Sequence, residues 1–283
     1  MIRQILLSLP TYPDCPPEQT LQGAAVLAKF LGAALTAQLP QLSSNPDTWP
    51  TTIGTFPLDF PEMMKEAVIQ SERNAAALAE AVTRVCAAAK VPLDLRRCQS
   101  TLFASSESLV DLARLHDLTI LPVPETDAFG RDYMQAALFS TGHPVLLLPS
   151  RQNGKPLQEL EKVVVAWDYS REAARALADA MPILRRAKMV HIVSVTGEKA
   201  IRTTSVPSDL EKYLTAHKVN YAVEQISLKG SSVADCVMSL ARGVNADILV
   251  MGAYGHSRLW EFIMGGATQG ILSDTRLPIL LSH

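Results

Sequence analysis

The stretch "KVVVAWDYSREAARALADAMPILRRAKMVHIVSV", residues 162–195, decides the fold class. Its two apolar runs, 162–167 and 189–195, have the length of buried strands. The segment between them has apolar residues at helical spacing, with Ser170 as a predicted N-cap and Glu172 as an acid suited to the helix N-terminus. Strand, helix and strand in this order predict a βαβ unit with two parallel strands.

The same alternation continues through the whole chain. After this unit we expect strands over 219–228, 246–252 and 277–282, helices near 208–217 and 231–243, and a helix from about Ala267. The N-terminal half predicts strands over 3–9, 33–39, 91–98, 117–123 and 143–149, again with helices between them. One irregular stretch, 40–61, interrupts only the first half. It is either a functional loop, or a surface excursion or a cover over the neighbouring half.

Two strand pairs match between the halves. "HDLTIL" resembles "ADILVM", which relates Asp117 to Asp247 at an offset of 130, and "GHPVLLLP" resembles "RLPILLSH", which relates Pro144 to Pro278 at an offset of 134. The similar offsets indicate a duplicated domain, with halves at 1–151 and 159–283 and a polar linker near 152–159.

The predicted fold is therefore α/β, with two doubly wound, mostly parallel five-stranded sheet domains. Each half ends on a short apolar strand, and a sheet edge must be covered or paired. We predict that the strands near 145 and 279 pair with each other and make an internal pseudo-dimer.

Composition limits the function classes. The chain has 283 residues, 48% hydrophobic, with a net charge of −2, and it lacks the basic block that nucleic-acid binding needs. The apolar run near the N-terminus is too short for a signal peptide or a membrane span, so we expect a cytoplasmic protein without membrane contact. The four cysteines form no zinc-binding pattern and are expected to be reduced and structural.

A glycine-rich stretch follows the strand at 246–252. "MGAYGHSRLWEFIMGGATQG", residues 251–270, holds five of the 14 glycines. Free backbone N–H groups and the N-terminus of a following helix favour phosphate at such a place. The spacing matches neither the Walker nor the dinucleotide motif, so the residues alone leave phosphate binding and simple turn formation open.

The spacing does resemble one family. Gly252, Gly255 and Gly265 fit the G-x2-G-x9-G-[ST] of nucleotide-binding universal stress protein domains, and "VAWDYSREAARAL" is similar to that family's first strand, loop and helix. The resemblance covers the C-terminal half and, more weakly, the first half, as in tandem-domain members. It implies an adenine nucleotide alpha hydrolase-like fold and a stress-response role.

The resemblance also implies a set of site residues. Asp168 and the backbone of Ala166 and Trp167 would face the adenosine, and the backbone of Val195 would hold the adenine edge. The ribose and phosphates would be wrapped by Gly252, Gly255, His256, Gly265, Gly266, Ala267 and Thr268. Gly266 stands where binders have Ser or Thr, which removes one hydroxyl, although Thr268 offers another nearby.

The first half lacks these features. At the offset of 130, Gly252 falls on Pro122 and Gly255 on Glu125, and the acids Glu125, Asp127 and Asp132 have the wrong charge for phosphate. No acid stands in the place of Asp168. We therefore expect at most one competent site, in the C-terminal half.

Several side chains have more than one interpretation. His256 is a general base or phosphate contact, or a half-exposed loop residue; Asp168 contacts the nucleoside, binds a metal or caps a helix. Arg258 is a phosphate clamp or a solvated charge, Trp167 is a core residue or stacks on adenine, and His191 is expected in the core.

Three functions follow. The favoured one is a regulatory or interaction module that binds ATP, ADP or AMP, with or without Mg²⁺, and acts on a protein partner; whether it forms a homodimer is open. The others are a slow ATPase and a scaffold whose site has decayed. The loop has no P-loop lysine and no evident carboxylate cluster for magnesium, which favours binding over phosphoryl transfer.

Overall fold

The computed structural model describes residues 1–43, 60–100, 106–123, 128–149, 157–196, 207–228, 230–253 and 277–283. The first half contains β1 (Gln4–Ser8), α1 (Glu18–Leu31), β2 (Ala34–Leu42), α2 (Phe60–Ala89), β3 (Leu93–Ser100), α3 (Ser106–Ala113), β4 (Leu118–Val123), α4 (Ala128–Ser140) and β5 (Val145–Pro149). The second contains β6 (Lys162–Ala166), α5 (Arg171–Leu184), β7 (Met189–Thr196), α6 (Pro207–Ala216), β8 (Tyr221–Ser227), α7 (Val233–Gly243), β9 (Ile248–Gly252) and β10 (Ile279–Ser282).

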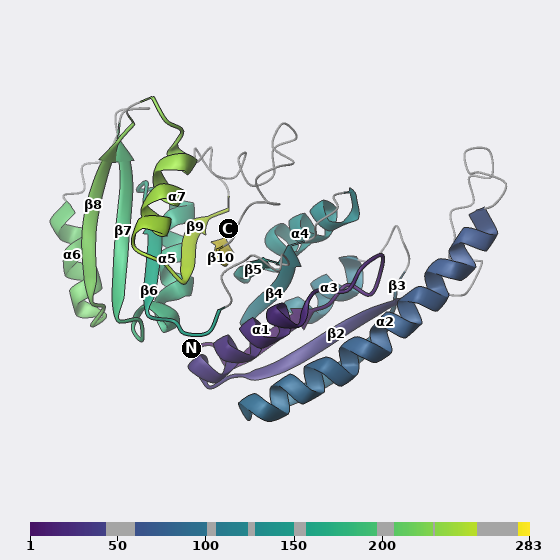
Figure 1. Ribbon diagram of the computed structural model, residues 1–283. Coiled ribbons are helices and arrows are strands. Elements are labelled where there is room, and N and C mark those ends of the chain that lie inside the picture. Colours follow the sequence, from purple (N-terminus) through teal and green to yellow (C-terminus); the bar gives the residue numbers. More distant parts are fainter. Residues whose placement is uncertain are drawn as a thin grey trace.

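These strands form one continuous ten-stranded sheet in the order β3-β2-β1-β4-β5-β10-β9-β6-β7-β8 (Figure 1). All neighbouring strands are parallel except β5 and β10, which are antiparallel with Leu146 opposite Leu280. Each half has the same strand order about this central pair. The predicted α/β fold and the predicted pairing of the strands near 145 and 279 are confirmed.

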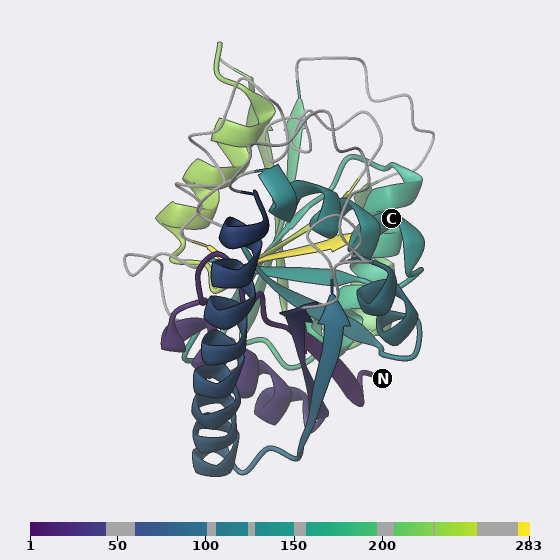
Figure 2. The ribbon, with the colours of Figure 1, turned by 90° about the vertical axis from the view of Figure 1, so that its right-hand side faces the viewer.

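Helices cover both faces of the sheet, as the near-continuous apolar strands require. One core cluster joins α1, α2, α5 and α6 to one face across both halves, and a second joins α3, α4 and α7 to the other. Figure 2 shows α2 upright in front of the first half, with the twisted strands fanning out behind it. The core is therefore shared between the halves.

Asp117 and Asp247 occupy matching places in the two halves. Oδ2 of Asp117 accepts from the N–H groups of Arg3 and Gln4 at 2.7 and 3.0 Å. Oδ2 of Asp247 accepts from those of Glu161 and Lys162 at 2.8 and 2.9 Å. Each carboxylate thus binds the start of the neighbouring strand, β1 or β6, and the relation inferred from the offset of 130 has a structural basis.

The pKa of Asp117 lies below its usual value. Burial raises the pKa, but the N–H groups of Arg3 and Gln4, the N-terminal ammonium and His143 together lower it more strongly. The native state therefore stabilises the charged carboxylate.

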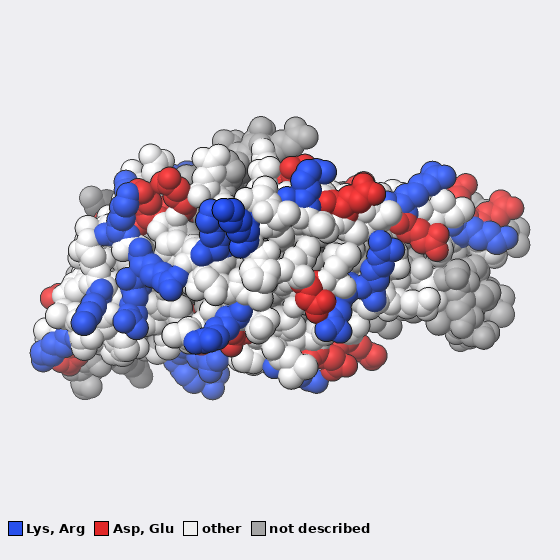
Figure 3. All heavy atoms as spheres, turned by 90° about the horizontal axis from the view of Figure 1, so that it is seen from below, with Lys and Arg blue, Asp and Glu red and all other residues white. Residues whose placement is uncertain are grey.

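Further contacts join the halves on either side of β5 and β10. The ring of Phe139 on α4 meets that of His283 edge-on at 5.0 Å, and Arg175 on α5 donates to the carbonyl of Gly142 at 3.2 Å. At the lower end, the guanidinium of Arg186 lies 5.9 Å from the ring of Phe30 and also donates to its carbonyl. In the view from below, Lys and Arg gather over the C-terminal half, whereas both signs mix over the first half (Figure 3).

The turn into α5 has the predicted cap. Ser170 caps α5 by accepting from the N–H of Ala173, with Glu172 in the first turn. All four cysteines are free, and burial raises the pKa of the Cys86 thiol to about 11. No described helix is long and apolar enough to span a membrane. Most of the 40–61 stretch, most of the linker and the helix expected from Ala267 lie outside the described residues.

The central strand pair gives a first prediction. Leu280→Ala removes a fully buried side chain opposite Leu146 and should lower the free energy of unfolding by about 2–5 kcal/mol. Urea denaturation followed by circular dichroism measures the loss, and Leu115→Ala, at a side chain 79% exposed, is the control expected to change little. A loss confined to one of two separate transitions would show that the halves do not share a core.

Asp117 gives a second prediction. Because its folded pKa lies below its unfolded value, its stabilisation is present above the unfolded pKa, about 3.9, and is lost as the pH falls through the folded pKa. Asp117→Asn should therefore lower stability by about 1 kcal/mol near neutral pH. Denaturation at a series of pH values should show the gap to wild type closing below about pH 4; a gap independent of pH contradicts this assignment.

Candidate functional site

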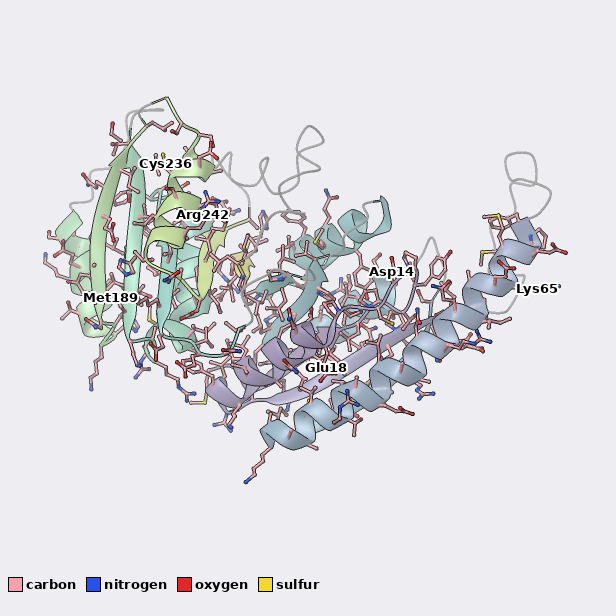
Figure 4. All side chains as sticks on the ribbon, in the orientation of Figure 1. Asp14, Glu18, Lys65, Met189, Cys236 and Arg242 are labelled. Atoms are coloured by element: carbon pink, nitrogen blue, oxygen red, sulfur yellow. The ribbon has the colours of Figure 1, made fainter. Side chains whose placement is uncertain are left out.

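The carboxyl ends of β6, β7 and β9 meet at one edge of the sheet, because these strands are neighbours and parallel. In Figure 4, β7 rises from the labelled Met189, and Cys236 lies high on α7. Ligands of doubly wound sheets bind at this kind of edge. The structure brings five of the predicted site residues to it: Ala166, Trp167, Asp168, Val195 and Gly252.

The other predicted site residues lie outside the described residues. They are Gly255, His256, Gly265, Gly266, Ala267 and Thr268, and the same holds for Arg258. Their assignment remains the prediction made from the sequence.

Asp168 lies exposed in the turn between β6 and α5. Its Oδ1 accepts from the N–H of Ser170 at 3.0 Å, and Tyr169 between them has a φ of 62°. This side-chain turn directs the chain away from the sheet and into α5. Within the described residues Oδ2 of Asp168 accepts no hydrogen bond, so one oxygen faces solvent at the edge.

Trp167 belongs to the packing of the site rather than to its surface. Its ring packs partly buried against the α5 side of the core and meets Tyr169 edge-on at 5.5 Å. Its backbone N–H closes the last bond between β6 and β7, to the carbonyl of Val193 at 2.8 Å. Of the two interpretations of this residue, the structure favours the core.

Val195 presents its backbone at the place where β6 has ended. In a parallel ladder, successive residues of a strand bond to alternate neighbours. Val193 bonds to Trp167 on the β6 side, and Thr196 accepts from Leu228 on the β8 side. The N–H and C=O of Val195 therefore face the β6 side, beyond the last β6–β7 bond, and no described residue pairs with them there.

The first half closes the same place. The Leu9 N–H donates to Gln38 as Trp167 does to Val193, so Pro40 is the counterpart of Val195. Pro40 has no N–H, and its carbonyl accepts from the hydroxyl of Thr11. One step further, the Leu42 N–H donates to the Ser71 Oγ of α2 at 3.0 Å.

Side chains also fill this edge of the first half. The Ser8 Oγ at the end of β1 lies 2.6 Å from the hydroxyl of Tyr133 and 3.2 Å from Gln38 Oε1. Burial raises the pKa of Tyr133 far above its usual value, because the phenolate would be desolvated. The ends of the two half-sheets are thus chemically different although their strand order is the same.

Gly252 has a steric role that the sequence interpretation missed. A Cβ built at this residue would lie 2.7 Å from the Glu172 Cβ and 2.8 Å from the Glu172 carbonyl carbon. The first turn of α5 therefore packs directly on the end of β9, and only glycine allows this approach. A glycine ending a strand opposite a capped helix start is the signal that could have indicated it.

One further side chain was given a place from the sequence. His191 is not a core residue: its Nδ1 lies 2.7 Å from the Glu224 Oε1 on β8, and the side chain is partly exposed. The described residues contain no group of three or more His, Cys, Asp or Glu side chains placed to hold a metal ion.

Gly252→Ala tests the packing of α5 on β9. The added methyl group must displace backbone atoms of Glu172, so the free energy of unfolding should fall by about 1–3 kcal/mol. Gly243→Ala, at a helical glycine with no atom within 4 Å of the added Cβ, is the matched control. Equal stabilities of the two variants in urea denaturation would contradict the close approach.

Comparisons with known proteins match part of the chain to one family. Residues 159–283 match the model of the universal stress protein family. A curated relative, a universal stress protein of Synechocystis, is 28% identical over 184 residues, which cover 62% of this chain and 60% of that protein. The matched region is thus less than two thirds of that relative's length.

Two solved structures extend the likeness to the whole fold. A universal stress protein from Archaeoglobus fulgidus covers 98% of this chain and 95% of its own, with a TM-score of 0.66 and 15% identity. A Pseudomonas aeruginosa protein of unknown function covers 99% of this chain and 92% of its own, with a TM-score of 0.56 and 15% identity. At such identity they establish the fold alone. Residues 159–283 thus match the universal stress protein family model, and the whole chain has the fold of these two structures.

Proposed function

We propose that the chain binds one adenine nucleotide at the carboxyl edge of β6, β7 and β9 and acts as a stress-response module that regulates or recruits a protein partner. The observation that carries the proposal is the backbone N–H and C=O of Val195, which no described residue pairs beyond the last bond between β6 and β7. A backbone N–H and C=O that a sheet leaves unpaired need a partner, either water or a ligand.

Adenine suits this pair chemically. Its edge presents an N6 amino donor beside a ring-nitrogen acceptor, which complements one C=O and one N–H. A base without an adjacent donor and acceptor in this order would leave one backbone group of Val195 unpaired, which costs free energy when the site is dry. This complementarity supports an adenine base at this position.

The rest of the nucleotide follows from neighbouring residues. Asp168, three residues before α5 and with Oδ2 free among the described residues, is placed to accept from a ribose hydroxyl. By the family resemblance, the phosphates meet the backbone of Gly255, Gly265, Gly266 and Ala267 and the side chains of His256 and Thr268. Gly252 supports this loop by holding β9 against α5.

We further propose that residues 1–151 form a degenerate domain of the same family without a nucleotide site. Pro40 supplies no donor where Val195 has one, Thr11 occupies its carbonyl, and Tyr133 and Ser8 fill the edge. The chain would then bind one nucleotide rather than two.

Val195→Pro tests the proposal with the first half's own residue. The proline removes the N–H that faces the ligand and spares the β7–β8 ladder, since Val195 points away from β8. We expect ATP, ADP or AMP affinity to fall about tenfold, which corresponds to about 1.4 kcal/mol. Isothermal titration calorimetry, with and without Mg²⁺, measures the affinity, and circular dichroism confirms the fold.

Pro40→Val is the matched control and should leave the stoichiometry at one nucleotide per chain, because Thr11 and Ser71 still close that edge. If wild type binds no adenine nucleotide at millimolar concentration, the proposal fails and the scaffold function takes its place. Binding with release of phosphate supports the ATPase function instead. Binding without turnover supports the module.

A further inference from the structure

The Val195 backbone is available to a ligand only if its N–H does not bond to the carbonyl of Trp167. Ala166 is in register with Val193, so the next pair of the ladder is Asp168 with Val195. In parallel pairing, the Val195 N–H would then donate to the Trp167 carbonyl, and the Tyr169 N–H to the Val195 carbonyl. These two bonds would extend the ladder by one step and would leave neither the N–H nor the C=O of Val195 available to a ligand.

Ser194 takes the acceptor that this step needs. Its Oγ donates to the Trp167 carbonyl at 2.8 Å, and the residue is only 5% exposed. Side chains of β7 alternate between faces, and the neighbouring Ile192 lies in the α5 side of the core, so Ser194 lies on that face as well. The bond draws the Trp167 carbonyl toward that face and away from the Val195 N–H in the plane of the sheet.

The turn after Trp167 completes the separation. Tyr169 adopts a φ of 62°, and the Ser170 N–H is held by Asp168 Oδ1, so the chain leaves the sheet and does not continue alongside β7. Neither of these features occupies the Trp167 carbonyl. Ser194 is the described side chain that does.

The first half provides a natural comparison. At the position of Ser194 it has Leu39, which is fully buried, and at the position of Val195 it has Pro40. Because Pro40 has no N–H, the first half needs no hydroxyl at the preceding position to keep a backbone N–H unpaired. The hydroxyl and the N–H are thus both present in the half with the open edge, and both absent from the half with the closed one.

We propose that Ser194 is a positioning residue: by binding the Trp167 carbonyl it stops β6 from pairing further with β7 and keeps the Val195 backbone available. The effect of Ser194 on nucleotide binding rests on the proposed function. Its effect on the pairing of β6 with β7 does not. In this role the Ser194 hydroxyl acts through the Trp167 carbonyl, to which it donates.

The test is Ser194→Ala with Ser194→Thr as the matched variant that keeps a hydroxyl. Amide hydrogen exchange of the protein without ligand, read at Val195 by NMR, is the primary measurement. In wild type and Ser194→Thr the Val195 amide should exchange quickly. In Ser194→Ala it should bond to the freed Trp167 carbonyl and exchange at least about tenfold more slowly.

Calorimetry gives the second measurement. Ser194→Ala should weaken ADP binding about tenfold, because the ladder bond must open first, and Ser194→Thr should restore it. A Val195 amide that exchanges equally fast in Ser194→Ala overturns the role of Ser194, whatever the affinity does. A wild type that binds no nucleotide while Ser194→Ala still protects Val195 overturns the proposed function and leaves the role of Ser194 standing.

Should Ser194→Ala fail to fold, Ser194→Cys replaces it, since it is nearly isosteric and only a weak donor. Slower exchange of Val195 than in wild type is again the expected result. Unchanged exchange again overturns the proposal.

Discussion

The antiparallel pairing of β5 with β10 is the contact on which the architecture depends. Each half-sheet is parallel and ends on a short, mostly apolar strand, which by itself would expose a row of backbone groups. Pairing the two ends satisfies both rows at once and lets each hydrophobic cluster continue across the junction. The halves therefore share both core clusters.

The same backbone plan ends differently in the two halves. At the end of β1 the chain continues beside β2, and Thr11 and Ser71 bind the groups of Pro40 and Leu42. At the end of β6 the chain turns into α5 after Trp167, and no described strand pairs with the Val195 backbone on the β6 side. The difference comes from a few residues in one turn and one strand, and not from the topology.

Patterns local in sequence predicted most of the fold. Strand and helix periodicity, the Ser170 cap and the relation of Asp117 to Asp247 all follow from neighbouring residues or from repeated ones, and the structure agrees with them. The edge pairing was predictable because unpaired edges are unfavourable. In the site, the place of Asp168 and Val195 followed from the family resemblance. The sequence did not predict the steric role of Gly252 or the bond from Ser194 to Trp167. Each depends on the register between segments that are distant in sequence.

The contacts around β5 and β10 have a consequence for behaviour on dilution. Two separate chains joined by such a strand pair would come apart at low concentration, because their association is bimolecular. Here the partner strand is tethered, and Phe139, Arg175 and Arg186 add contacts on both sides of the pair. The pairing is intramolecular, with an effective concentration set by the tether. The two-half arrangement thus persists at any protein level in which the chain is folded, and its two halves are always present in a ratio of one to one.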